Sequence, residues 1–207
     1  QWVRLNSKKY SKMSYKLIKR GIDLLLSITA LLSLAPVFLV VALLIRINMG
    51  GPIIFRQLRP GLNGNTFEMY KFRTMLTAPL GNELSDEARI TRLGRFLRAS
   101  SLDELPELLN VIKGDMSLIG PRPLLVEYLA MYSQVQMRRH EVLPGVTGLA
   151  QVKGRNSLTW SSKFRYDVFY VDHLNWKLDW MILLGTIKVV LLRSGFRSHG
   201  EAKKFGE

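Results

Sequence analysis

Two adjacent carboxylates, Asp103 and Glu104, are the side chains of this sequence best suited to chemistry. They lie in the stretch 100–107, and Pro106 follows them closely. A carboxylate can attack phosphorus and form a covalent intermediate, and a second carboxylate can hold a divalent cation. Because neighbouring side chains point in different directions, the two groups can take these two different tasks.

A capping role is the structural alternative for the same residues. Ser101 and Glu104 have the spacing of a capping box, in which both side chains bond free N–H groups of a first helical turn. Pro106 argues against it, because a proline at the fifth helical position lacks the N–H that should bond the carbonyl of Ser101. We expect the helix to begin near Asp103 and to end near residues 113–114, with both carboxylates at its positive end. The spacing alone leaves both interpretations open.

Basic side chains able to meet a diphosphate are spread along the chain. Arginine is the residue best suited to bidentate phosphate binding. Prolines on both sides of Arg122 fix the backbone there, which indicates a positioned side chain. Each of these residues could equally be an ordinary surface cation. The candidates are Lys71, Arg73, Arg98, Arg122 and Arg155.

The composition limits the classes of partner. The 207 residues include 30 Lys and Arg against 16 Asp and Glu, so the net charge of +14 favours nucleic acid, an anionic leaflet or phosphorylated substrates. Neither a Walker A loop nor a G-x-G-x-x-G loop occurs. The absence of cysteine excludes disulfides and cysteine metal sites. His140, His173 and His199 are isolated, and we interpret them as structural or surface groups.

An uncharged apolar segment, residues 24–45, is long enough to matter for a membrane. As a straight helix at about 1.5 Å per residue it would measure roughly 33 Å, about one hydrocarbon thickness. Pro36 should break this helix, and basic residues flank both ends, which places both ends on the cytoplasmic side. The pattern favours a re-entrant helix over a cleaved signal, and a kinked single-pass helix stays open.

The remaining chain predicts a small β-hairpin followed by helices. Strands are expected near 53–55 and 67–72, with a turn at 59–64. A helix from Ser85 carries arginines beside an apolar face, and the apolar tail 176–192 carries two tryptophans one turn apart. Both helices suit either the membrane interface or the protein core. Further helices are expected over residues 124–137 and 162–173, separated by the glycine-rich, irregular stretch 144–156.

Six short motifs occur in order along nearly the whole chain. They are Lys19-Arg20 with Asp23 ahead of the apolar helix, residues 70–75 (YKFRTM), 101–106 (SLDELP), 113–117 (KGDMS), 120–123 (GPRP), and 144–148 (PGVTG) with 154–156 (GRN). From about Lys19 to Gly195 the chain resembles the bacterial sugar transferases, which are monotopic phosphoglycosyl transferases. Its short form looks most like the phospho-diacetylbacillosamine transferases of bacterial protein glycosylation.

The resemblance implies an α+β, mainly α-helical, monotopic membrane protein. Residues 1–47 would form a basic segment and a re-entrant helix broken at Pro36, and residues 48–207 a cytoplasmic catalytic domain with interfacial helices and a small β-hairpin. The location would be the cytoplasmic face of the bacterial inner membrane, against its anionic lipids. One departure is visible, since the family commonly has Ser-Pro at the helix break and this chain has Ala35-Pro36.

The resemblance also implies an activity. Asp103 would attack the β-phosphorus of a UDP-sugar, UMP would leave, and undecaprenyl phosphate would take the phosphosugar from the aspartate. Glu104 would hold a magnesium ion, Mg²⁺, and Lys71, Arg98, Arg122 and Arg155 would contact phosphate or nucleotide. Asp167 matches another recurrent acid of the family.

Two other classes of function are weighed against this one. A non-catalytic membrane-surface scaffold would keep the anchor, but the intact Asp103-Glu104 pair argues against it. A nucleic-acid-binding protein would suit the charge, but the apolar segment and the lack of a binding motif argue against nucleic acid as a partner. The sequence leaves open the sugar, the pathway and a homodimer.

Overall fold

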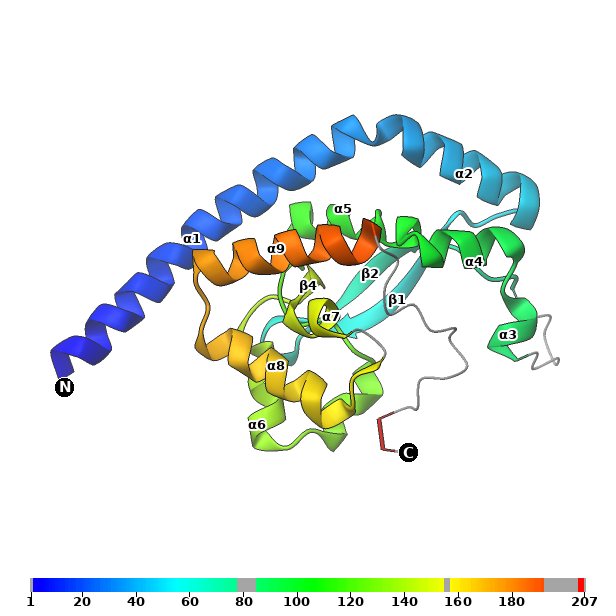
Figure 1. The fold of residues 1–207 in the computed structure, drawn as a ribbon. Coiled ribbons are helices and arrows are strands. Elements are labelled where there is room, and N and C mark those ends of the chain that lie inside the picture. Colours follow the sequence, from blue (N-terminus) through cyan, green and yellow to red (C-terminus); the bar gives the residue numbers. More distant parts are fainter. Residues whose placement is uncertain (1, 78–84, 155–156, 192–204, 207) are drawn as a thin grey trace.

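Two helices at the start of the chain form one bent arc. The computed structural model describes residues 2–77, 85–154, 157–191 and 205–206. Helix α1 (Trp2–Ser33) and helix α2 (Ala35–Met49) run along one side of the molecule, with α4, α5 and α9 beneath them (Figure 1). The break falls where Pro36 occupies the first turn of α2, as the sequence predicts.

The break bends the apolar segment. No single helix in the described part of the chain is long and apolar enough to cross a bilayer. Tyr15–Ser33 and Ala35–Met49 together meet that test of length and composition, with a bend of 62° between them. Across the break, the N–H of Leu34 donates to the carbonyl of Ala30 at 2.9 Å, and the N–H of Phe38 donates to the carbonyl of Leu34 at 2.9 Å. The re-entrant path itself stays a prediction.

One face of α2 packs on the rest of the protein. Val41 and Ile45 are buried in a cluster with Phe72 and Leu97. The opposite face is exposed and apolar, and Leu39 is 72% exposed and Ile47 71%. α2 therefore joins the domain along one side and offers the other side to an apolar environment.

The predicted β-hairpin is confirmed. β1 (Ile54–Pro60) pairs antiparallel with β2 (Thr66–Phe72), with Ile54 opposite Phe72 and Pro60 opposite Thr66. A 3₁₀ turn, η1 (Leu62–Gly64), joins them within the predicted turn.

The helix expected from Ser85 is instead two helices, so that prediction was wrong in its continuity. α3 (Asp86–Arg89) ends where Ile90 forms an isolated antiparallel bridge with Met75. α4 (Arg92–Ala99) then begins afresh, with the Thr91 hydroxyl accepting from the N–H of Gly94 at 2.9 Å. A side-chain cap and a bridge outweigh helical continuity here.

Short elements follow up to residue 153. They are η2 (Leu102–Glu104), α5 (Glu107–Lys113), β3 (Ser117–Ile119), η3 (Val126–Met131), α6 (Gln134–Met137), η4 (Arg138–Glu141), β4 (Gly145–Thr147) and α7 (Leu149–Lys153). β3 and β4 pair in parallel, which the sequence analysis missed. The continuous helix expected over 124–137 was wrong, because a 3₁₀ segment and a one-turn helix with its own capping box at Ser133 take its place.

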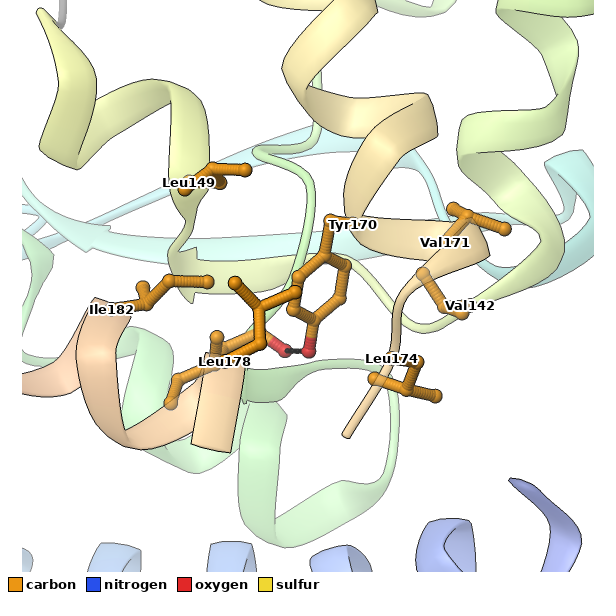
Figure 2. Packing of buried hydrophobic residues seen from close by; sticks show 8 residues of the cluster. Val142, Leu149, Tyr170, Val171, Leu174, Leu178 and Ile182 are labelled. Carbon is orange, nitrogen blue, oxygen red and sulfur yellow. Dashed lines mark hydrogen bonds between the residues drawn. The ribbon is translucent and has the colours of Figure 1, made fainter. Parts of the chain in front are cut away.

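Two longer helices close the main core. α8 (Trp160–Asp172) and α9 (Trp176–Leu191) confirm the helices expected near 162–173 and 176–192. Tyr170 of α8 packs among Leu178, Ile182 and their neighbours (Figure 2). Its hydroxyl donates to the carbonyl oxygen of Ile119 at 3.0 Å. The outer face of α9 leaves Trp176 and Trp180 exposed. α9 thus packs on the core with one face and exposes an amphipathic surface on the other.

A polar network fastens α1 to this core. Arg20 donates to the carbonyls of Val111 (2.6 Å) and Ile112 (3.0 Å), at the end of α5. Asp23 is buried and accepts from the Ser117 hydroxyl at 2.7 Å. Lys19 pairs with Asp179 of α9 at 2.9 Å, and the same carboxylate accepts from Tyr15. The motif Lys19-Arg20 with Asp23 is therefore an attachment between α1, α5 and α9.

Candidate functional site

The Asp103-Glu104 pair lies on a 3₁₀ turn ahead of α5. Ser101 has a left-handed φ of 58° and makes no side-chain capping bond, so the capping-box alternative is wrong. Pro106 is the N-cap of α5, so the helix begins at Glu107, and the expected start near Asp103 was also wrong. Asp103 is only 8% exposed. The proline ends the turn, and the carboxylates belong to the turn instead of the helix.

Glu104 is held by two cations from different parts of the chain. Lys71 of β2 donates to its Oε1 at 2.9 Å, and Arg122 also pairs with Oε1. Burial would raise the pKa of Glu104, but Arg122 and Lys71 outweigh burial and hold that pKa well below its ordinary value. Glu104 is therefore the fixed negative charge of the site.

For Asp103, burial outweighs the neighbouring cations, so its pKa is shifted in the opposite direction. Its burial and the adjacent charge of Glu104 raise the pKa of Asp103 to about 6, against the opposing effect of Lys71, Arg122 and Arg98. Two neighbouring carboxylates with pKa values pushed apart suit two different roles. Near neutral pH Asp103 is mainly a carboxylate, poorly hydrated and able to act as a nucleophile.

Glu107 is a third carboxylate that the sequence analysis did not assign. It is 1% exposed at the start of α5, and its Oε1 lies 3.1 Å from Lys71 Nζ. Burial, with Glu104 nearby, raises the pKa of Glu107 to about 7. Lys71 thus lies between two carboxylates, which fixes its ammonium group beside the site.

Asn110 fixes α5 against β2. Its side-chain amide accepts from the N–H of Tyr70 at 2.9 Å and donates to the carbonyl of Glu68 at 2.6 Å. Because Tyr70 precedes Lys71, this pairing sets the register between the carboxylates of the turn and Lys71. A buried asparagine within the apolar run 108–112 was the available clue in the sequence.

Arg122 is positioned by backbone hydrogen bonds between two motifs, residues 120–123 and 144–148. The N–H of Gly120 donates to the carbonyl of Thr147 at 2.9 Å, and the N–H of Gly145 donates to the carbonyl of Pro121 at 3.0 Å. Added Cβ atoms on Gly120 or Gly145 would collide with backbone of the opposite segment. Glycine is needed at both positions because the two backbones lie in direct contact.

A buried ion pair supports Arg122 from behind. Arg139, which is 2% exposed, donates to the carbonyl of Arg122 at 2.6 Å. Its guanidinium also donates twice to Asp167 Oδ2, at 3.1 Å from Nε and 2.8 Å from Nη2. Burial raises the pKa of Asp167, and Arg139 opposes that shift. The structure therefore places Asp167 behind Arg122, where it holds Arg139.

The other predicted phosphate-binding residues lie in different settings. Arg73 donates to the carbonyls of Met49, Gly50 (2.9 Å) and Gly51 (2.6 Å), at the end of α2. Arg98 of α4 donates to the Thr74 hydroxyl at 2.9 Å, and its charge acts on Asp103. Arg155 lies outside the described residues. Lys71, Arg122 and Arg98 thus surround the carboxylates, whereas Arg73 fastens α2 to the hairpin.

The histidines fit the structural role expected of them where they are described. His140 is buried with Nδ1 3.1 Å from the carbonyl oxygen of Gly61, and His173 stacks on Phe169 with ring centroids 4.1 Å apart. His199 lies outside the described residues. Among the described residues no three His, Cys, Asp or Glu side chains gather as a metal site.

Known proteins identify the family. The model of the family "Bacterial sugar transferase" matches residues 14–193. The chain belongs to the bacterial sugar transferases. That match covers the bent helix pair, the carboxylate turn and α9, so the elements that build the site are elements of a sugar transferase.

Individual relatives agree with this family. An uncharacterized sugar transferase EpsL of Bacillus subtilis is 47% identical over 193 residues, which cover 91% of this chain and 96% of that protein. An exopolysaccharide production protein ExoY of Sinorhizobium fredii is 39% identical, covering 86% of this chain and 87% of that protein. The undecaprenyl-phosphate galactose phosphotransferase of Salmonella typhimurium is 40% identical, covering 89% of this chain but 43% of that protein.

Proposed function

We propose that this sugar transferase moves a sugar 1-phosphate from a UDP-sugar to undecaprenyl phosphate, with Asp103 as the nucleophile. The observation that carries the proposal is the pair of unlike carboxylates. Asp103 is buried with a raised pKa, and Glu104 beside it is held ionised by Lys71 and Arg122. The names of two relatives, an undecaprenyl-phosphate galactose phosphotransferase and a UDP-glucose:undecaprenyl-phosphate glucose-1-phosphate transferase, support the reaction class.

The first step forms a bond between a carboxylate oxygen of Asp103 and the β-phosphorus of the donor. The bond from that phosphorus to the bridging oxygen breaks, and its electron pair leaves with UMP. In the second step a phosphate oxygen of undecaprenyl phosphate attacks the same phosphorus, and the bond to Asp103 breaks. The products are an undecaprenyl-diphospho-sugar and a free carboxylate, so two displacements at one site replace a single direct transfer.

The cations of the site match the charge that these steps develop. Lys71, Arg122 and Arg98 surround the carboxylates, and fixed cations stabilise negative charge on phosphoryl oxygens without reorganising. Lys71 is itself pinned between Glu104 and Glu107, so its ammonium group is in place before the donor binds. Both reactants are anionic, which suits the net charge of +14.

Glu104 fits a magnesium ion shared with the donor. Both cations that hold it contact Oε1, so among the described residues Oε2 is the oxygen that a metal ion would meet. Mg²⁺ is commonly held by one or two carboxylates together with substrate phosphates and water, so a full protein cage is not needed. Bound there, Mg²⁺ would neutralise the diphosphate and stabilise the leaving UMP.

The anchor and the interfacial faces suit a substrate that stays in the bilayer. The exposed apolar faces of α2 and α9 would lie in the cytoplasmic leaflet of the bacterial inner membrane, with α1 and α2 as a re-entrant arc. Basic residues would meet anionic lipid headgroups. A site so placed can receive a water-soluble donor and a lipid-borne acceptor, as the first membrane step of glycoconjugate assembly requires.

Two measurements test the proposal. Membranes or detergent-purified protein with Mg²⁺ and a panel of UDP-sugars should release UMP over many turnovers only when polyprenyl phosphate is added, and at most one UMP per protein without it. With the right donor and no acceptor, intact-protein mass spectrometry should show the added mass of one phosphosugar on the wild-type chain.

The matched variant is Asp103→Asn, which keeps the shape of the side chain and removes its charge. Turnover and the covalent adduct should both vanish in it, because an amide is not a nucleophile at neutral pH. An Asp103→Asn chain that still turns over, or a wild-type chain that never gains the phosphosugar, would contradict the assignment.

A further inference from the structure

Phe205, a half-buried residue far along the chain after α9, contacts four aromatic rings that together are called the aromatic pocket. The pocket is made of Tyr128, Tyr132, Trp160 and Phe164. The ring centroid of Phe205 lies 5.5, 5.8, 5.3 and 5.0 Å from theirs, in the same order. Interplanar angles from 41° to 73° are the tilted and edge-to-face arrangements that aromatic pairs prefer.

The pocket is built by the folded domain itself. Trp160 and Phe164 belong to α8, and Tyr128 belongs to η3. Its four rings also contact one another, as in Tyr132–Phe164 at 5.3 Å and Tyr128–Trp160 at 5.6 Å. Its walls therefore come from elements other than the segment that fills it.

The segment that carries Phe205 is seated specifically. The N–H of Phe205 donates to the Tyr128 hydroxyl at 3.4 Å. The next residue, Gly206, has a φ of 102°, and an added Cβ would collide with the end of Met131. A side chain larger than glycine would be strained there by its backbone conformation, whereas the flexible end of Met131 could move aside.

The wall of the pocket touches the support of the active site. Arg139 lies with its Cζ 5.9 Å from the ring centroids of both Tyr132 and Phe164. The same guanidinium donates to the carbonyl of Arg122, and Arg122 pairs with Glu104. A continuous set of contacts therefore joins the pocket to the carboxylate turn.

We propose that the aromatic pocket is a binding site for the Phe205 side chain, and that its occupation holds Arg139, and through it Arg122, in the position that donor binding requires. Phe205 is then a positioning residue. The inference rests on the proposed function, because Arg122 gains this role only where the site handles a diphosphate. With the pocket empty, water would reach the rings and Arg139. The Arg139 side chain would then be less firmly packed, and its hydrogen bond to the Arg122 carbonyl would weaken.

The kinetic test compares Phe205→Ala with Phe169→Ala. Phe169 is an exposed phenylalanine of α8 that stacks on His173, so it matches the change without touching the pocket. At a temperature well below unfolding, Phe205→Ala should raise KM for the UDP-sugar by about threefold to tenfold, the size expected if the free energy of about one of its four ring contacts is passed on to donor binding. Phe205→Tyr should restore most of the affinity, and Phe169→Ala should leave KM unchanged.

A double-mutant cycle tests whether the effect passes through Arg139. Asp167→Asn loosens Arg139 from its other side, so the effects of Asp167→Asn and Phe205→Ala on KM should be less than multiplicative when combined. Independent, fully multiplicative effects would overturn the proposed route.

A binding test needs no turnover and separates this inference from the proposed function. A chain ending at residue 204 should show a saturable change in tryptophan fluorescence on adding a peptide with the sequence 200–207, because Trp160 lines the pocket. The same peptide with alanine at 205 should give no change. No response to the phenylalanine peptide, or a Phe205→Ala chain with wild-type KM, overturns the inference. Absence of UMP release by the wild type would instead refute the proposed function, and the fluorescence titration would still decide whether the pocket binds Phe205.

Discussion

Replacing Gly94 by alanine should destabilise this protein, although alanine is the better helix former. Gly94 lies in α4, where the helix crosses the backbone just after β2. An added Cβ would overlap the carbonyl group of Thr74. The obstacle is backbone, so no flexible side chain can move aside, and either α4 or the segment after β2 must shift.

The expected size follows from two opposing effects. Gly→Ala within a helix gains about 1 kcal/mol or less from propensity. Overpacking against a rigid neighbour costs about 1–3 kcal/mol. Because the added Cβ would lie 1.9 Å from a backbone oxygen, the cost should reach the upper end of that range. The net loss should then be about 2 kcal/mol, which for a chain of this size corresponds to a fall in Tm of about 4–8 °C. Displacement of α4 should also stretch the bond from Arg98 to Thr74, so turnover should fall at temperatures below the transition.

Gly21→Ala is the matched control. Gly21 lies inside α1, and an added Cβ there meets no atom within 4 Å. The same substitution should therefore be neutral or raise Tm by about 2–4 °C. Thermal unfolding of the three chains in one detergent, followed by circular dichroism, decides the matter. A Gly94→Ala chain as stable as Gly21→Ala would show that the contact with Thr74 does not constrain the fold.

Three further changes have clear expected outcomes. Asp167→Ala should cost about 3–5 kcal/mol of unfolding free energy by leaving Arg139 buried without its partner, and adding Arg139→Met should recover much of that loss in denaturant titrations. Burial and the charge of Arg139 lower the pKa of His140 from its ordinary 6.5 to about 4, so stability should be full above pH 6.5 and fall by up to about 3 kcal/mol as the pH drops towards 4. A His140→Gln chain should lose that part of the pH dependence of Tm, and an unchanged profile would argue against it. Lys71→Met should lower kcat for UMP release about 100-fold, because Glu104 and the donor lose a fixed cation, whereas Lys71→Arg should retain part of the rate.

Local sequence patterns were sufficient to predict the helix break at Pro36, the β1–β2 hairpin, and the helices α8 and α9. Pro36 breaks the apolar helix because a proline cannot continue it. The apolar residues on both sides of the turn at 59–64 predict the two strands of the hairpin. These features depend on interactions between near neighbours in the chain. Residue types and spacing drew attention to the pair Asp103-Glu104, but they left a capping role open, which only the structure removed.

The rest depends on partners distant in sequence. Glu107 looks like an ordinary polar residue at the start of a helix, and only the fold brings Lys71 against it. Arg73 resembles a phosphate-binding residue from its charge, but the carbonyls it meets belong to the end of α2. The parallel pairing of β3 with β4 joins three-residue strands, which are too short to show a period in the sequence.

Because Arg73 binds the carbonyls at the end of α2, the two N-terminal helices cannot be removed without affecting the catalytic domain. A shortened protein that starts at residue 52 would leave the guanidinium of Arg73 without the three carbonyls at Met49, Gly50 and Gly51. It would also uncover the apolar patch around Phe72 and Leu97 on which α2 rests. Attempts to obtain a soluble catalytic fragment by trimming the N-terminal helices would therefore damage the strand that carries Lys71, and preparations in detergent or nanodiscs should keep both helices.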